Sequence, residues 1–166
     1  MTAIAYRDGM IAADRQSTFD NISHQFVKIR TMEVHTLGWC VVAMSGYIGN
    51  VERMCDILKY NIKGTGTALV DYGMNNSYGL ICDSLGKVYR VYGDGLVGSA
   101  EINEFLAEGS AFGFLCGAMA QGVTAQEAVK LACKHCDGVG QAVDVVNVME
   151  ELQPYINLER PEGTPW

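Results

Sequence analysis

The residue with the clearest chemical potential is Thr2, which directly follows Met1. Removal of Met1 would give Thr2 a free α-amine, so that one residue would carry both a nucleophilic hydroxyl and a nearby base. A strand, a turn and a second strand follow, and Asp14 comes just after the second strand. This arrangement suggests a hydrolase with an N-terminal threonine nucleophile, although Met-Thr is also a common start of soluble proteins with no such chemistry.

The elements that would position these groups begin with a β-hairpin. Residues 2–6 predict a strand, Asp8-Gly9 is a two-residue hairpin signal, and residues 10–13 return as a second apolar strand. Residues 15–25 are polar and predict a turn or an exposed hairpin. The next strand, over residues 26–29, is apolar except for Lys28.

The middle of the chain predicts a buried strand followed by an amphipathic helix. Residues 39–44 are entirely apolar and stop at Ser45-Gly46. A helix then begins near Asn50, its N-cap, and ends before Gly64. Its apolar residues recur at helical spacing, so one face packs on a sheet. They are Val51, Met54, Cys55, Leu58 and Ile62.

The second half predicts three more strands, two adjacent helices and a last strand. The strands are residues 68–70, 78–82 and 87–92, followed by a loop over 92–95. A helix from Ser110 to Gly122 is apolar on every side, which predicts that it is central and buried all round. Thr124 and Glu127 form a capping box that opens the next helix, which Asp137-Gly138 closes. Residues 143–148 form the last strand, and an irregular tail is expected from Gln153 to Trp166.

The order of these elements indicates the fold class. Strands, a helix, strands, two adjacent helices and a strand do not alternate as a parallel βαβ protein would. Helices packed on antiparallel sheets fit the order better. We therefore expect an α+β protein that is a four-layer αββα sandwich, with two antiparallel sheets flanked by helices.

Size and composition place this fold in one domain, with residues 1–150 as its body and 151–166 as its tail. The formal charge is −7 and the basic residues are scattered, which excludes the electrostatic footprint of a nucleic-acid-binding protein. The chain has no apolar run long enough for a membrane span and no signal peptide, so we expect a cytoplasmic protein. The sequence predicts no cofactor.

The six cysteines favour free thiols over disulfides, because Cys40, Cys55, Cys116 and Cys133 lie in apolar runs of predicted strands and helices. Cys133 and Cys136 form a C-x-x-C pattern around His135, and at helical spacing both point to the same side, toward the core. A second pair of ligands is not evident, so no metal site is predicted.

Six segments in order carry a resemblance to a known family. The chain resembles proteasome β-subunits and the peptidase subunit of the bacterial two-component ATP-dependent protease, both N-terminal nucleophile hydrolases, over roughly residues 2 to 148. The matching pieces are residues 2–14 (TAIAYRDGMIAAD), 27–29 (VKI), 45–50 (SGYIGN), 109–110 (GS), 125–132 (AQEAVKLA) and 143–146 (VDVV). Each piece alone is weak, and the ordered set is specific.

The resemblance implies roles for particular residues. Thr2 would be the nucleophile, and its own α-amine, through a water, would accept the proton. Lys28 would favour the neutral amine and stabilise the developing alkoxide, with Asp14 as its carboxylate partner. Gly46 would supply the backbone N–H of the oxyanion hole, and Ser110 would hydrogen-bond near the amine. The plain structural alternatives are an edge-strand lysine, a turn aspartate, a turn glycine and an N-cap serine.

Two further positions would meet the substrate, by the same resemblance. Thr18 would align the substrate backbone, and Met44 would line the first specificity pocket, which suggests a preference for apolar side chains. One region departs from the family pattern. Where the family carries an Asp and a hydroxyl residue after the second helix of the pair, this chain has Cys136 and Val139, and Asp137 matches only after a one-residue shift.

The leading function implied by the resemblance is a threonine peptidase that assembles into stacked homo-oligomeric rings, degrades polypeptides inside a chamber and is fed by an ATPase unfoldase. Only Met1 precedes Thr2, so maturation would depend on a methionine aminopeptidase. The alternatives are a catalytically silent ring or scaffold subunit and a small-molecule amidase with the same scaffold. A serine or cysteine triad fits less well, because no His lies beside a nucleophile-elbow sequence.

Overall fold

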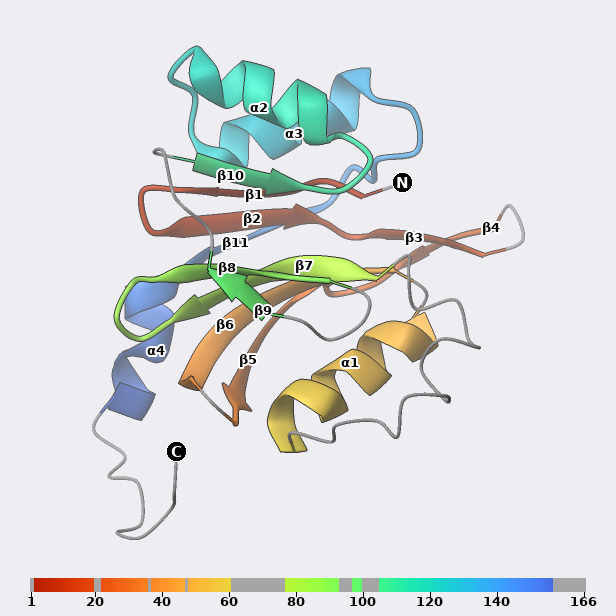
Figure 1. Ribbon diagram of the computed structural model, residues 1–166. Helices are drawn as coiled ribbons and strands as arrows, with labels where there is room; N and C mark the ends of the chain where they lie inside the picture. Colours follow the sequence, from red (N-terminus) through yellow and green to blue (C-terminus); the bar gives the residue numbers. More distant parts are fainter. Residues whose placement is uncertain are drawn as a thin grey trace, which may run out of the picture.

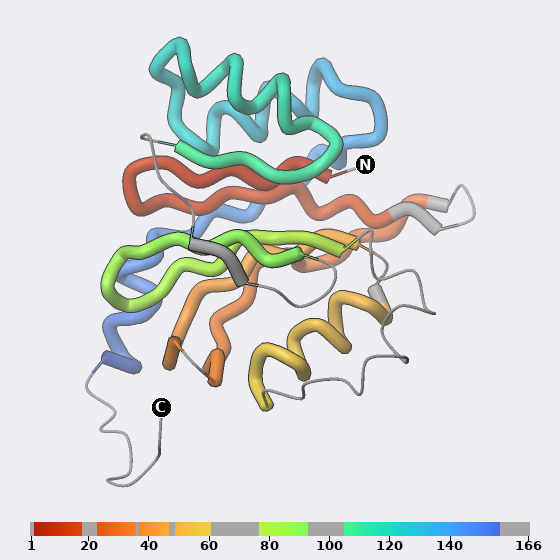
Figure 2. Tube along the Cα trace, viewed as in Figure 1, coloured from red at the N-terminus to blue at the C-terminus, as the bar shows by residue number. Residues whose placement is uncertain are grey.

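Four layers of helices and sheets enclose three apolar clusters in the computed structural model (Figure 1). The structure describes residues 2–19, 22–35, 37–46, 48–60, 77–92, 97–99 and 105–156. Two helices cover the outer face of a four-stranded sheet, a five-stranded sheet faces it, and a third helix covers the far side of the second sheet (Figures 1 and 2). The expected αββα sandwich of antiparallel sheets is therefore confirmed.

The first sheet has the strand order β10-β1-β2-β11 and is antiparallel throughout. Its strands are β1 (Ile4–Arg7), β2 (Met10–Asp14), β10 (Phe105–Glu108) and β11 (Val143–Asn147). The helices α2 (Phe112–Ala120) and α3 (Ala125–His135) cover it. The Thr124 hydroxyl and the Glu127 carboxylate form the expected capping box at the start of α3.

The second sheet has the order β5-β6-β7-β8-β9, also antiparallel. Its strands are β5 (Ile29–Val34), β6 (Gly38–Ser45), β7 (Tyr78–Asp83), β8 (Val88–Val91) and β9 (Val97–Ser99). The helix α1 (Ile48–Tyr60) packs on its outer face. A separate hairpin of β3 (Gln16–Phe19) and β4 (Ile22–Gln25) projects from the sandwich, as Figure 1 shows.

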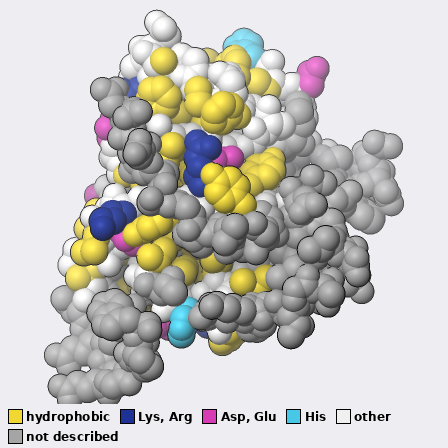
Figure 3. Space-filling view, in the orientation of Figure 1, with side chains coloured by type: hydrophobic (Ala, Val, Ile, Leu, Met, Phe, Trp, Pro, Cys, Tyr) yellow, Lys and Arg dark blue, Asp and Glu magenta, His cyan; other side chains and the backbone are white. Residues whose placement is uncertain are grey.

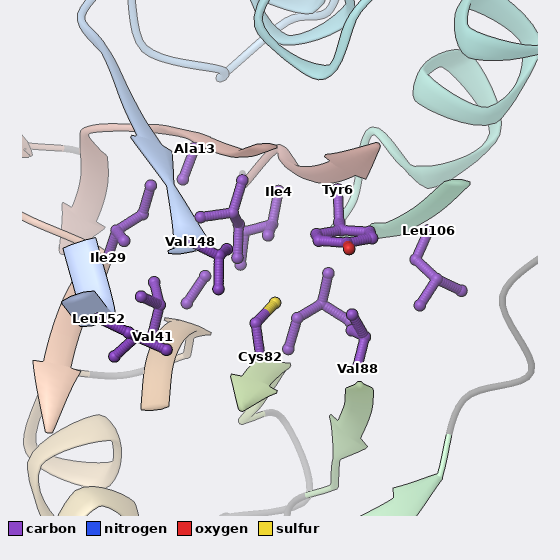
Figure 4. Close-up of a cluster of buried hydrophobic side chains, with 13 residues drawn as sticks. Ile4, Tyr6, Ala13, Ile29, Val41, Cys82, Val88, Leu106, Val148 and Leu152 are labelled. Atoms are coloured by element: carbon purple, nitrogen blue, oxygen red, sulfur yellow. The ribbon is translucent and has the colours of Figure 1, made fainter. Parts of the chain in front are cut away.

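The central core lies between the two sheets. In Figure 4, Ile4 and Tyr6 from the first sheet point toward Val41, Cys82 and Val88 of the second. Side chains of a strand alternate between its two faces, so β6 sends every second residue into this core and the others toward α1. Val41 and Ala43 belong to the central cluster, whereas Cys40, Val42 and Met44 belong to the cluster under α1.

Several element boundaries differ from the expectations. The helix α1 begins at Ile48, two residues before Asn50, so Asn50 is not its N-cap. Strand β5 begins at Ile29, and Lys28 precedes it rather than interrupting it. Residues 153–156, expected to be irregular, belong to α4 (Val148–Ile156), where Val148 and Leu152 close the end of the central core. A helix with Pro154 in its last turn gave little sequence signal.

The placement of α2 also differs from the expectation of a helix buried all round. Leu115 and Met119 are buried against the first sheet, but Phe112 and Phe114 are exposed on the outside of the molecule. The short strands β9 and β10 were not predicted. The expected strand over residues 68–70, the end of the first helix at Ile62 and Gly64, and residues 93–95 of the expected loop lie outside the described residues.

The six cysteines are free, as expected. Cys133 and Cys136 are half-buried and pack against the cluster under α2 and α3. Within the described ranges, three or more potential ligands do not gather at any point where a metal ion could be held. In the same residues, no helix combines the length and apolarity that crossing a membrane requires.

Candidate active site

Thr2 lies at the end of the interface between the two sheets, just before β1, and only 8% of it is exposed. Its hydroxyl has two buried neighbours. The Lys28 ammonium donates to Thr2 Oγ1 at 3.1 Å, and the Ser45 hydroxyl donates to the same atom at 2.8 Å. In the sequence, Lys28 is 26 and Ser45 is 43 positions from Thr2, and the packing of the two sheets brings the three residues together.

Asp14, at the end of β2, is fully buried and accepts four hydrogen bonds. Its Oδ1 accepts from the Lys28 ammonium at 2.7 Å and from the Ala3 N–H at 2.8 Å. Its Oδ2 accepts from the Gln16 and Gly140 N–H groups, both at 3.0 Å. A buried carboxylate that accepts four hydrogen bonds is fixed in position. Asp14 is therefore an anchor for the lysine and for two chain segments, and not a turn residue.

Lys28 is 3% exposed, so its charge is taken out of water. Burial lowers the pKa of the Lys28 ammonium, and the Asp14 carboxylate opposes that shift. A salt bridge of this kind is sustained by its hydrogen bonds, which here extend from Asp14 through Lys28 to Thr2. The arrangement directs a cationic donor at Thr2 Oγ1, which is the geometry that stabilises an alkoxide at that atom.

Ser110 contacts the main chain of Thr2 from the loop between β10 and α2. The Thr2 N–H donates to Ser110 Oγ at 2.9 Å, and the Ser110 hydroxyl donates to the Thr2 carbonyl oxygen at 3.3 Å. The N-cap of α2 is Ala111, so Ser110 does not cap that helix. Gly109 makes this contact feasible, because a Cβ there would lie 2.2 Å from the Thr2 carbonyl oxygen.

Gly46 follows Ser45 directly and has a φ of +143°, a conformation that side chains disfavour. A Cβ on Gly46 would lie 2.4 Å from Ser77 Oγ and 2.9 Å from Ser77 Cα. Ser77 is itself buried, and its hydroxyl lacks a hydrogen-bond partner within the described part of the chain. The backbone at Gly46 is thus pressed against Ser77 and leaves no room for a side chain.

Substitution of Gly46 by alanine is therefore expected to lower the free energy of unfolding by about 2 kcal/mol or more, because overpacking and an unfavourable φ add. Urea denaturation would measure the change. Gly49→Ala is the matched control, since a Cβ at Gly49 meets nothing within 4 Å and the residue lies in α1. The control should be neutral or slightly stabilising. Equal stability of the two variants would contradict this account of Gly46.

The two residues expected to contact substrate are Met44 and Thr18, and of these only the side chain of Met44 lies in the described part of the structure. Met44 is 1% exposed and packs under α1 with Val42 and Met54, on the face of β6 opposite to Ser45. Its role in a specificity pocket stays a prediction. Thr18 lies in β3, paired with Ser23 of β4, and its side chain is outside the described part of the structure.

The region that departs from the family pattern lies after α3. Asp137 is exposed, whereas Val139 is buried in the cluster under α2 and α3. The contact of this loop with the site is made by the backbone, through the Gly140 N–H that donates to Asp14. Among the described residues, the Asp137 side chain is therefore not a hydrogen-bond partner of Thr2 or Ser110.

Ser45 is the site residue that the sequence reasoning missed. It is 5% exposed, and its hydroxyl contacts the same atom of Thr2 as Lys28 does. A polar residue that ends an apolar strand, in phase with the core-facing Val41 and Ala43, was the available signal.

The chain has no match among family models and none among curated proteins. Solved structures do match it. Eukaryotic HslV from Trypanosoma brucei is 16% identical, with a TM-score of 0.61 over 87% of this chain and 97% of that chain. The Gly-1 mutant of Anbu from Hyphomicrobium sp. strain MC1 is 13% identical, with a TM-score of 0.65 over 88% and 80%.

Another structure, of Anbu from Pseudomonas aeruginosa in a helical assembly, is 13% identical, with a TM-score of 0.60 over 89% of this chain and 80% of that chain. At these identities the likeness establishes the fold. The chain therefore has the fold of HslV and Anbu, which is the fold that the sequence resemblance implied.

Proposed function

We propose that this chain, with the fold of HslV and Anbu, is the threonine peptidase subunit of a self-compartmentalising ring protease. The observation that carries the proposal is the buried contact series from Asp14 through the Lys28 ammonium to Thr2 Oγ1, at 2.7 and 3.1 Å. A lysine that only stabilised the fold would not need to end on the hydroxyl of the second residue of the chain. Burial of an ammonium group is costly, so its position favours a chemical role.

In this proposal, removal of Met1 frees the α-amine of Thr2. Thr2 Oγ attacks a peptide carbonyl carbon, its proton passes to the α-amine, and the carbonyl π electrons move to the oxygen. The Gly46 N–H would donate to that oxyanion. Collapse of the tetrahedral intermediate expels the amine of the leaving peptide, which takes the proton, and leaves an ester on Thr2. Water then hydrolyses the ester and restores the hydroxyl.

Lys28 and Ser110 would assist in different ways. Lys28 carries the positive charge that stabilises the alkoxide at Oγ, and it disfavours protonation of the neighbouring amine. Ser110 holds the main chain of Thr2 on both sides of its Cα, through the N–H and the carbonyl. With Met1 removed, the same serine would hold the amine, so that amine and hydroxyl keep a fixed relation.

Assembly is proposed from the exposed apolar side chains of α2. Phe112 is 45% and Phe114 38% exposed, and Figure 3 shows apolar side chains gathered at the top of the molecule, where α2 lies in Figure 1. Large apolar residues clustered on a surface favour association with another chain. We propose that other copies of this chain cover them in a homo-oligomeric, stacked double ring. The substrate would be a polypeptide, an ATPase unfoldase would supply it, and the particle would be cytoplasmic.

A catalytically silent ring subunit is the second candidate. The region after α3 favours it. This chain has Cys136 and Val139 where the family carries an Asp and a hydroxyl residue, Asp137 is exposed, and Val139 is buried.

Three measurements on the purified full chain test the proposal: the intact mass, the native mass and the cleavage of fluorogenic peptides. Loss of Met1, a multiple of the subunit mass that fits a ring, and cleavage by that particle are expected. A ring that retains Met1 and does not cleave would support the silent subunit instead. Activity in a monomer or dimer, on small amides only, would support the small-molecule amidase.

A further inference from the structure

We propose that Ser45 is a catalytic residue that acts as a second hydrogen-bond donor to the nucleophile, so that the Thr2 alkoxide forms between two fixed donors. This inference rests on the proposed function, because it assigns Ser45 to the same reaction. It is carried by one contact, from the Ser45 hydroxyl to Thr2 Oγ1 at 2.8 Å, made by a residue that is 5% exposed.

The position of Ser45 is set by β6, which is an interior strand of its sheet. It pairs with β5 on one side and with β7 on the other, and Ser45 itself pairs with Tyr78. Because side chains alternate, Ser45 faces the first sheet in phase with Val41 and Ala43. An interior strand is held on both edges, so the serine hydroxyl is presented to Thr2 from a rigid support.

The hydrogen bonds at Thr2 Oγ1 define what Ser45 contributes. A hydroxyl oxygen has two lone pairs and one proton. The Lys28 ammonium and the Ser45 hydroxyl donate to the lone pairs, which directs the Thr2 proton away from both of them. When that proton passes to the α-amine, the electron pair of the broken O–H bond forms the new bond to the carbonyl carbon. The two donors already lie in place on the oxygen that gains charge.

The same contact serves the second half of the reaction. In the hydrolysis of the ester on Thr2, water attacks the ester carbonyl carbon and gives one proton to the α-amine of Thr2. The tetrahedral intermediate then expels Oγ, which takes that proton back from the α-ammonium. A donor at 2.8 Å stabilises the charge on that leaving oxygen as it did on the attacking one. Ser45 would therefore act in both acylation and deacylation, without itself gaining or losing a proton.

The first test measures the acidity of the nucleophile and does not require catalysis. In a Thr2→Cys variant, the pKa of the introduced thiol is read from the pH dependence of alkylation, resolved by peptide mass mapping. Adding Ser45→Ala should raise that pKa by about one unit, since a donor to the thiolate is lost. Burial raises the pKa of Cys40 and of Cys82 to about 12, so these native thiols stay protonated.

The matched control is Ser84→Ala in the same Thr2→Cys background. Ser84 follows β7 at the end opposite to Tyr78, so its hydroxyl is remote from Thr2. It should leave the alkylation profile unchanged. An unchanged profile with Ser45→Ala as well would overturn the inference, and this result is obtained whether or not the protein cleaves peptides.

The second test uses the active particle. Ser45→Ala should lower kcat about tenfold, with KM unchanged, because the lost donor acts on the charged states of Oγ and not on substrate binding. Ser45→Thr, which keeps the hydroxyl, should restore most of the rate. An unchanged kcat in Ser45→Ala would contradict the role of Ser45. Cleavage that survives Thr2→Ala would instead contradict the proposed function, so the two failures are distinguishable.

Discussion

Replacement of Thr2 by alanine is expected to abolish peptide cleavage, with a loss of at least about a thousandfold in kcat. The reason is that the substitution removes Thr2 Oγ1, the atom to which both the Lys28 ammonium and the Ser45 hydroxyl donate hydrogen bonds. Neither neighbour can replace it. The Lys28 ammonium is engaged by Asp14, and Ser45 has no base beside it among the contacts of the described residues.

The measurement is the steady-state cleavage of a fluorogenic peptide by the assembled wild-type and variant particles. Thr2→Ser is the matched control, because it keeps the hydroxyl and should retain cleavage at a reduced rate. The native mass and the thermal unfolding of Thr2→Ala should match the wild type, since the Asp14–Lys28 pair remains and Ser110 bonds only to the backbone of residue 2. Undiminished cleavage by Thr2→Ala would place the active centre elsewhere.

Two of the longer elements were predictable from the sequence for physical reasons. Residues 39–44 of strand β6 are an uninterrupted apolar run, and the strand is buried between α1 and the first sheet. The helix α3 begins with a capping box whose residues define its start locally. The strands β9 and β10 are three and four residues long, and their pairing partners, not their own composition, define them.

The helix α2 shows how composition misleads. A helix that is apolar on every side is expected inside a core, yet here one face packs on the first sheet and Phe112 and Phe114 point outward. The apolar pattern indicates that both faces favour an apolar environment. It does not indicate whether the second face is covered by the same chain. The proposed assembly would supply that cover from another copy.

The site was predicted in part, because its residues differ in how much sequence signal they leave. Lys28 and Asp14 are charged residues at the edges of apolar segments, and the resemblance assigned them to one place. The sequence signal for Ser45 was its place in the alternation of β6, in phase with the core-facing Val41 and Ala43. That signal is weak, because one serine at the end of a strand is common. Its meaning depends on the distance of 2.8 Å to a residue 43 positions away, which packing determines.

Asp14→Asn is expected to be the most destabilising single substitution at the site, with a loss of about 3 to 5 kcal/mol in the free energy of unfolding. The asparagine would leave the Lys28 ammonium as a buried charge without a counterion. The two Asp14 oxygens together accept four hydrogen bonds. In asparagine, an amide nitrogen that can only donate would replace one of these oxygens and would face its donors. Cleavage should be lost as well, because Lys28 would no longer be held on Thr2.

Urea denaturation of the purified full chain measures this loss, and Asp144→Asn is the matched control. Asp144 pairs with Arg15, but the Arg15 side chain is 40% exposed, so solvent screens that pair and its removal should cost much less. Similar losses in the two variants would contradict the distinction between a buried and a screened ion pair.

The loss in Asp14→Asn should also depend on pH, in a direction set by Lys28. Burial already lowers the pKa of Lys28 below its ordinary value of 10.5, and removal of the Asp14 carboxylate would lower that pKa further. Between the lowered pKa and 10.5, the unfolded chain binds a proton that the folded chain lacks, so stability rises with pH across that window. The variant should therefore recover part of its stability relative to the wild type as the pH is raised. A difference in unfolding free energy that stays constant with pH would show that Lys28 is not the charge left unpaired.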